Sequence, residues 1–157
     1  MIWVGYRRST DAARELLEDP DLIEDLLESD QDVTSVDLDK SWHGIHWLLT
    51  GSEEPTADIA SEALFGGEPV GEDLGYGPAR LLSAERVSAV ASVLSEVDVD
   101  ALRARMDGAA MTQAGIYPLI WDQENVFDTY LAPNYQTLRR FYEVAAESAE
   151  SVIQTIC

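Results

Sequence analysis

The sequence contains few of the residues that most often carry chemistry or cross-links. Cys157 is the only cysteine, Lys40 is the only lysine, and the two histidines are His43 and His46. A single cysteine excludes a disulfide within the chain, which fits a reducing compartment. The sequence also lacks paired cysteines, a His-Glu-x-x-His helix and a calcium-loop pattern, so we expect no metal site and no cofactor.

Basic residues are also scarce, which narrows the classes of partner. The 157 residues include 30 Asp and Glu against 10 Lys and Arg, for a net charge of −20. Such a surface repels phosphate backbones and anionic lipid heads, so we expect neither nucleic acid nor a membrane as partner. It attracts cations and basic proteins, although acidic surfaces also serve solubility alone.

Long apolar runs are missing as well. No stretch approaches the roughly 20 residues that cross a bilayer, and the first residues lack the basic region and apolar run of a signal peptide. With 46% hydrophobic residues, the chain still has enough apolar surface to fold. We therefore expect one cytoplasmic domain over residues 1–157.

The hydrophobic pattern predicts an α+β fold, a mainly helical single domain packed around a small sheet. Strands are predicted at 2–8, where β-branched and aromatic residues gather, near 79–82 in Ala-Arg-Leu-Leu, and at 151–157. Apolar spacing and capping residues predict helices at about 10–17, 20–27, 41–50, 56–65 and 134–148. Two further helices are predicted to begin at Ser83 and at Asp98, and another is predicted from Asp122 to Leu131. We expect an irregular loop after residue 65 and a helix break at Pro133.

Acidic residues are concentrated in the first two predicted helices. Between residues 11 and 39 there are twelve acids and one base, Arg14. Most of these acids lie on helix faces other than the leucine face, which is typical of a solvated surface. The same surface is our candidate docking patch for a basic protein partner, with Glu18, Glu24 and Glu28 as the partner-binding candidates.

Both histidines lie beside tryptophans in one short segment. If residues 41–50 are helical, Trp42 and His46 share a face, because they are four residues apart. His46 has two interpretations: a general base or ligand anchor in a pocket, or a partly buried ring that ties two elements together through a backbone carbonyl. The candidate ligand pocket consists of Trp42, His46, Thr50 and Tyr117, and we assign no catalytic residue.

The same segment resembles a known family. Asp37-Leu38-Asp39-Lys40-Ser41-Trp42, then Ile45-His46 and Leu49-Thr50-Gly51, is similar to the Asp-Lys-x-Trp-x-x-Leu-His-x-x-Leu-Thr-Gly segment of the bacterial YfbM-like proteins, a domain of unknown function. Gly5-Tyr6, Gly75-Tyr76-Gly77-Pro78-Ala79-Arg80 and Ile116-Tyr117-Pro118 are also similar, in the same order. The resemblance implies a single α+β domain in the bacterial cytosol and no activity. It singles out His46, whereas His43 falls at a position that the motif leaves open.

The sequence leaves three functions open. Our leading hypothesis is a non-catalytic cytosolic binding module that engages a protein partner, with an immunity-type role as one version. The alternatives are a small-molecule enzyme, hydrolase-like and with His46 as base, or a ligand sensor that uses the Trp42 and His46 pocket. An open cavity containing His46 favours an enzyme or sensor, and a filled core beside an acidic surface favours the binding module.

Overall fold

A computed structural model describes residues 1–28 and 34–157 of the chain and gives the α+β fold that the sequence predicts. The strands are β1 (Trp3–Arg8), β2 (Ser35–Asp37), β3 (Glu68–Val70), β4 (Ala79–Leu82) and β5 (Ser151–Ile156). The helices are α1 (Thr10–Glu18), α2 (Leu22–Glu28), α3 (Trp42–Thr50), α4 (Ile59–Phe65), α5 (Ala84–Glu96), α6 (Val99–Arg103), α7 (Gly108–Gln113) and α8 (Ala132–Glu147). Two shorter helical segments, η1 (Asp39–Ser41) and the π-helical η2 (Phe127–Leu131), lead into α3 and α8.

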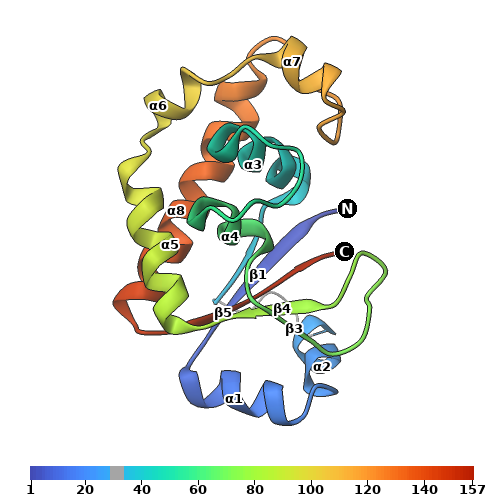
Figure 1. Cartoon of the computed structure of the whole chain (residues 1–157), viewed down its shortest axis with the longest axis vertical. Helices are drawn as coiled ribbons and strands as arrows, with labels where there is room; N and C mark the ends of the chain where they lie inside the picture. The colour runs from blue at the N-terminus through green and yellow to red at the C-terminus, as the bar shows by residue number, and fades with distance from the viewer. Residues whose placement is uncertain (29–33) are drawn as a thin grey trace.

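The five strands form one antiparallel sheet with the order β2-β1-β5-β4-β3. The last strand, β5, is central, and Trp3 of β1 pairs with Ile156 of β5. The first and last strands therefore run side by side, as Figure 1 shows. Consecutive β5 residues face opposite sides of the sheet, because Val152 packs into one hydrophobic cluster and Ile153 into another.

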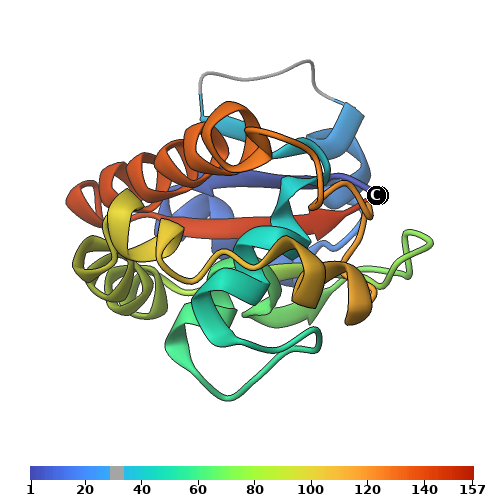
Figure 2. The same ribbon diagram turned by 90° about the horizontal axis from the view of Figure 1, so that it is seen from above.

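Helices cover both faces of this sheet. In Figure 1 α1 and α2 lie on one side, and α3, α4, α5 and α8 lie on the other. The smaller cluster packs Leu16 of α1 and Ile23 of α2 against Ile153 of the sheet. The larger cluster contains Trp3 together with buried residues of α3, α5 and α8. The acidic helices thus form a layer of their own, on the other side of the sheet from α3, which carries both histidines. In Figure 2, which looks down on the molecule from the α3 side, α3 lies in front of the sheet.

Side-chain caps fix several helix starts where the sequence predicts them. The Ser9 hydroxyl accepts a hydrogen bond from Ala12 N at the start of α1, and the Asp98 carboxylate accepts one from Ala101 N at the start of α6. The Ser83 hydroxyl accepts from Arg86 N, so α5 begins at the predicted residue. Each cap satisfies one of the backbone N–H groups that a first helical turn leaves unpaired.

Two local expectations are wrong. The chain does not become helical at Asp122, because residues 122–125 form turns and η2 begins at Phe127. Pro133 does not break the helix either, since η2 continues directly into α8. Pro133 lies in the first turn of α8, where its missing N–H interrupts no α-helical hydrogen bond.

The sheet also has two more strands than predicted. β2 and β3 are three residues each, too short to show an alternating hydrophobic pattern. They occupy the two edges of the sheet, where Pro69 is tolerated because an edge strand leaves half of its backbone groups unpaired. In the described part of the chain, no helix is long and apolar enough to cross a membrane.

Candidate functional site

The helix α3 holds the Trp/His segment, and its end is defined by Gly51. Gly51 has a φ of 73°, and its N–H donates to the Trp47 carbonyl over 2.7 Å, which closes the helix as the sequence predicts. The Thr50 hydroxyl donates to the His46 carbonyl over 2.9 Å and accepts from Ser52 N over 3.2 Å. These bonds turn the chain back, so that residues 52–56 pass beside the two imidazoles.

His46 is fully buried and makes a hydrogen bond through each ring nitrogen. Its Nδ1 lies 3.0 Å from the Ser52 carbonyl, and its Nε2 lies 3.0 Å from the Ser61 hydroxyl on α4. A carbonyl only accepts, so Nδ1 carries the proton and Nε2 accepts from the Ser61 O–H. The same Ser61 oxygen accepts from Thr56 N over 3.0 Å. One imidazole therefore connects α3, α4 and the segment between them.

The electrostatics of His46 favour the neutral ring. Burial lowers the pKa of His46 to about 4 from its ordinary value of 6.5, more than the Ser52 carbonyl raises it. A weaker repulsion from His43 acts in the same direction as burial. At neutral pH the ring is uncharged, which agrees with the tautomer that its two hydrogen bonds require.

His43 adopts the opposite tautomer and binds the neighbouring carbonyl. Its Nε2 lies 3.0 Å from the Glu53 carbonyl and carries the proton, while its Nδ1 accepts from Tyr117 N over 3.1 Å. Its ring stacks on Trp42 with centroids 4.9 Å apart and planes at 11°. Together the two histidines bind the consecutive carbonyls of Ser52 and Glu53 to the same helix.

The structure brings the four predicted pocket residues to one junction around α3. Trp42 is 5% exposed and packs edge-on against Phe65, with Tyr117 beside it at a centroid distance of 6.5 Å. The rings of Trp42 and His46 both contact Phe65 of α4. Thr50 uses its hydroxyl within the helix end, bonded to the His46 carbonyl and to Ser52 N. Ligand binding by Trp42, His46, Thr50 and Tyr117 stays a prediction.

Gly44 allows this junction to close. A Cβ atom at Gly44 would lie 2.5 Å from Cη2 of Trp121 and 3.0 Å from Leu131 Cδ2. The indole of Trp121 is buried, and its Nε1 donates to the Ile116 carbonyl over 2.6 Å. Because Gly44 has no side chain, Trp121 can pack closely against the helix at this position.

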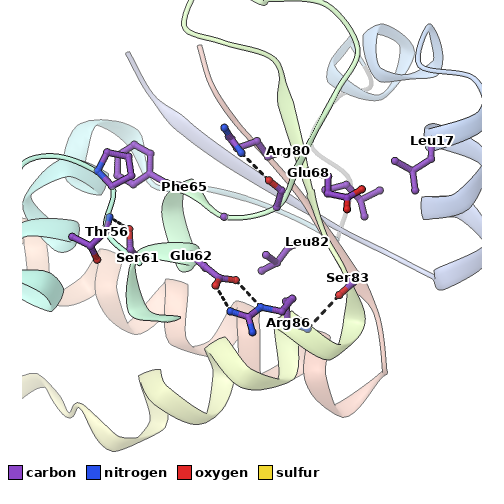
Figure 3. Close-up of a pocket in the computed structure, with 14 residues that line it drawn as sticks. Leu17, Thr56, Ser61, Glu62, Phe65, Glu68, Arg80, Leu82, Ser83 and Arg86 are labelled. Carbon is purple, nitrogen blue, oxygen red and sulfur yellow. Dashed lines mark hydrogen bonds and ion pairs between the residues drawn. The ribbon is translucent and has the colours of Figure 1, made fainter. Parts of the chain in front are cut away.

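A cavity of about 520 Å³ borders α4 (Figure 3). Leu17 of α1, Ser61 and Phe65 of α4, Arg80 of β4 and Arg86 of α5 are among the residues that line it. Ser61 belongs both to this wall and to the contact with His46, so the buried imidazole is one side chain away from the cavity. The cavity draws on five elements, and sequence reasoning missed Ser61 because no local pattern distinguishes this serine.

The charged groups of this cavity are largely paired. Glu62 and Arg86 form a two-point ion pair, in which Arg86 Nε donates to Glu62 Oε2 over 2.9 Å (Figure 3). Arg80 donates to the Gly67 carbonyl over 2.7 Å. Glu68 is exposed beside them. Two arginines and two glutamates make the lining neutral overall, so its charge selects no ligand class.

The acidic surface is exposed as predicted. Glu18 of α1 and Glu24 and Glu28 of α2 are all exposed, and residues 10–28 contain eight carboxylates and one base, Arg14. Arg14 pairs with Asp11 over 3.1 Å at two highly exposed side chains, a contact that contributes little to stability. Within residues 1–28 and 34–157, no group of three or more His, Cys, Asp or Glu is placed to hold a metal ion.

Fold and site together define a class of protein, in which an acidic helical layer and a histidine-bearing helical layer enclose a five-stranded antiparallel sheet. The model of the family described as domain of unknown function (DUF1877) matches residues 1–155, and the chain belongs to this family. The chain is similar to the crystal structure of a protein of unknown function, YfbM from Escherichia coli. The identity is 23%, each chain is covered to 100%, and the TM-score is 0.78. At this identity the likeness shows the fold alone. No curated protein matches the chain.

Proposed function

We propose that the chain is a bacterial, cytoplasmic, non-catalytic binding module whose helices α1 and α2 engage a basic protein. An immunity-type role, in which the acidic surface neutralises a basic toxin, is one version of this function. The observation that carries the proposal is the charge of residues 10–28, where eight exposed carboxylates accompany one arginine. A surface of one sign raises the association rate of a partner of the other sign.

The packing of α1 and α2 supports the same proposal. Leu16 and Ile23 are buried against the sheet, so the helices are held by their apolar faces and leave the carboxylates to solvent. Leu17 is 45% exposed next to Glu18 and gives the acidic surface an apolar contact. Meanwhile both ring nitrogens of His43 and of His46 are bonded within the fold, which supports a structural role for the two imidazoles.

Charge reversal tests the proposal. A variant with Glu18, Glu24 and Glu28 changed to Lys raises the net charge by six at three exposed positions. A matched control changes Glu96, Glu124 and Glu147 to Lys, since these are exposed residues outside α1 and α2. Partners captured from a lysate of the source organism are identified, and their association rates are measured at about 50 and 300 mM salt.

We expect basic partners, faster association at the lower salt concentration, and a slower rate for the first variant than for the control. Exposed charges are screened over about 8 Å at physiological ionic strength, which accounts for the expected salt effect. Equal rates for both variants, or rates independent of salt, would overturn the proposal and leave the acidic surface a solubility device.

A second candidate function is a small-molecule hydrolase or ligand sensor at the 520 Å³ cavity. The observation that favours it is the Ser61 hydroxyl, which lines the cavity and donates to the neutral His46 Nε2, as a nucleophile does to its base. The Ser61 hydroxyl also accepts from Thr56 N, so it already makes two contacts. Hydrolysis of p-nitrophenyl acetate that is lost in both Ser61→Ala and His46→Gln would support this candidate.

A further inference from the structure

A separate cavity of about 470 Å³ lies between α8 and the edge of the sheet that β1 and β2 form. Its two charged lining residues are Arg7 of β1 and Arg140 of α8, and none of its described lining residues is an Asp or Glu. The positive charge of these two side chains is opposite in sign to the net charge of the whole chain, which has three acids for every base. In the described part of its wall, the cavity therefore presents two guanidiniums and no carboxylate, on a protein that is otherwise acidic.

The fold builds this site from arginines that are far apart in the sequence. The sequence shows only two pairs of neighbouring arginines, and one member of each pair reaches the cavity. Arg7 Nη1 donates to Glu150 Oε2 over 2.9 Å, and Arg140 Nη1 donates to Glu143 Oε2 over 2.7 Å. Neither glutamate lines the cavity. Both carboxylates hold a guanidinium from outside the cavity.

The guanidiniums keep capacity for a ligand. Each guanidinium has five N–H groups, and among the described residues the side chains of Arg7 and Arg140 each make one hydrogen bond. The Arg140 side chain is 65% exposed, whereas the Arg7 side chain is 16% exposed. A ligand that enters meets both charges, and a carboxylate, sulfonate or phosphate accepts paired N–H groups from such side chains.

The rest of the wall is partly apolar. Phe141 and Val144 of α8 and Val36 of β2 line it together with the polar Thr34 and Gln136. A cavity of this volume lies within the range of small-molecule sites. The combination of an apolar wall with two arginines fits a ligand with an anionic group and an apolar body.

We propose that this cavity binds a small amphipathic organic anion, independently of the acidic surface on α1 and α2. The net charge of −20 repels large polyanions such as nucleic acids. For a small anion, charges more than about 8 Å away are screened at physiological ionic strength. The carboxylates of Glu150 and Glu143 offset part of the arginine charge, so the attraction comes from the remaining guanidinium N–H groups, which donate directly to the anion. The site therefore selects a compact ligand with one or two negative charges.

Naphthalene-1-sulfonate is a suitable probe, and naphthalene-1-sulfonamide is its uncharged counterpart of the same shape. Both are titrated into the full chain at about 150 mM salt by NMR, with the amide signals of Val36 and of Phe141 as reporters. We expect saturable binding of the sulfonate, with shifts at both reporters, and at least tenfold weaker binding of the sulfonamide. Arg140→Gln should weaken sulfonate binding about tenfold, or 1.4 kcal/mol.

Arg139→Gln is the matched control, because it removes the same charge from the neighbouring residue. Arg139 donates to the Ser95 carbonyl and does not line this cavity. The affinity of the Arg139→Gln variant for the sulfonate should stay within about twofold of that of the unmodified chain. Equal affinity for sulfonate and sulfonamide, equal weakening by both substitutions, or no shifts at the reporters would each overturn the proposal. The thermal melt of the Arg140→Gln variant should match that of the unmodified chain, because this side chain is largely exposed.

Discussion

His46 Nε2 accepts a hydrogen bond from the Ser61 hydroxyl over 3.0 Å, and this contact joins α3 to α4. The ring and the hydroxyl are both buried, so neither finds a replacement partner in water. Because Ser61 also accepts from Thr56 N, a single hydroxyl serves both helices and the segment between them. The position of α4, which lines the 520 Å³ cavity, thus depends on the protonation state of His46.

The first prediction concerns pH. The folded chain lowers the pKa of His46 to about 4, whereas the unfolded chain has the ordinary value of 6.5. As pH falls below about 6.5, the unfolded chain takes up the proton first, so the free energy of unfolding that depends on His46 decreases. The decrease is complete near pH 4 and amounts to on the order of 3 kcal/mol. Urea unfolding at pH 7, 6, 5 and 4 measures it.

His46→Gln is the control for this titration, because glutamine keeps a hydrogen-bond acceptor near Ser61 and has no proton to gain. Carboxylates titrate in both proteins and cancel when the two curves are subtracted. The difference between the unmodified chain and the variant should shrink steadily from pH 7 to pH 4. Parallel curves would mean that the imidazole of His46 is as easily protonated in the folded chain as in the unfolded chain.

The second prediction concerns Ser61. Ser61→Ala leaves His46 Nε2 and Thr56 N without their partner, and both lie in or beside the core. A buried polar group without a partner costs about 1–3 kcal/mol, so the variant should unfold at a clearly lower urea concentration. Ser88→Ala is the control, an exposed serine on α5 where the change should stay within about 0.5 kcal/mol. Equal stability of the two variants would contradict the structural role of Ser61.

The third prediction concerns the contact between Gly44 and Trp121. Alanine favours a helix by about 1 kcal/mol over glycine, yet its Cβ would lie 2.5 Å from Trp121 Cη2. We expect Gly44→Ala to lower the free energy of unfolding by about 1–3 kcal/mol, the usual cost of overpacking. The same substitution should cost less in a Trp121→Phe background, which lacks the clashing atom. Additive effects in this double-mutant cycle would argue against the contact.

The sequence predicted the elements whose signals are local. Regular apolar spacing identified α5 and α8, and Ser83, Asp98 and Gly51 marked helix ends because a cap needs only its own turn. The two edge strands were missed, since three residues carry no periodic pattern. The switch from π-helix to α-helix before Pro133 was also missed, because a proline in the first helical turn cannot be told from a helix breaker without the backbone path.

The candidate sites likewise combine features that local spacing predicts with features that only the packing of the chain determines. Local spacing placed Trp42 and His46 on one helix, and the structure confirms this. The partners of His46 are Ser52 and Ser61, and the path of residues 51–60 brings them to the ring. Packing sets this path, and no sequence motif marks it. Arg7 and Arg140 line one cavity only because β1 pairs into the sheet and α8 packs beside it, and neither arrangement can be predicted from local sequence.

The last prediction concerns Gln154, a polar residue in the central strand that holds α4 on the sheet. Its Nε2 donates to the carbonyls of Glu62 and Gly66 over 2.9 and 2.8 Å, and its Oε1 accepts from Trp3 Nε1 over 3.0 Å. Gln154→Leu keeps a similar volume but removes all three bonds, so we expect a loss of about 2 kcal/mol. Because one of the bonds ends on Glu62 of α4 and another on Gly66, which directly follows α4, hydrogen exchange of the α4 amides should accelerate more than that of α8.

Gln113→Leu is the control, since this glutamine is exposed at the end of α7 and should change neither stability nor exchange in α4. The exchange pattern distinguishes a local tether from general stability. If Gln154 acts as a tether, α4 opens on its own while α8 keeps its protection. If exchange rises equally in α4 and α8, Gln154 stabilises the whole fold without positioning α4. In that case the geometry of Ser61 beside His46 must be held by the α3 side of the contact alone.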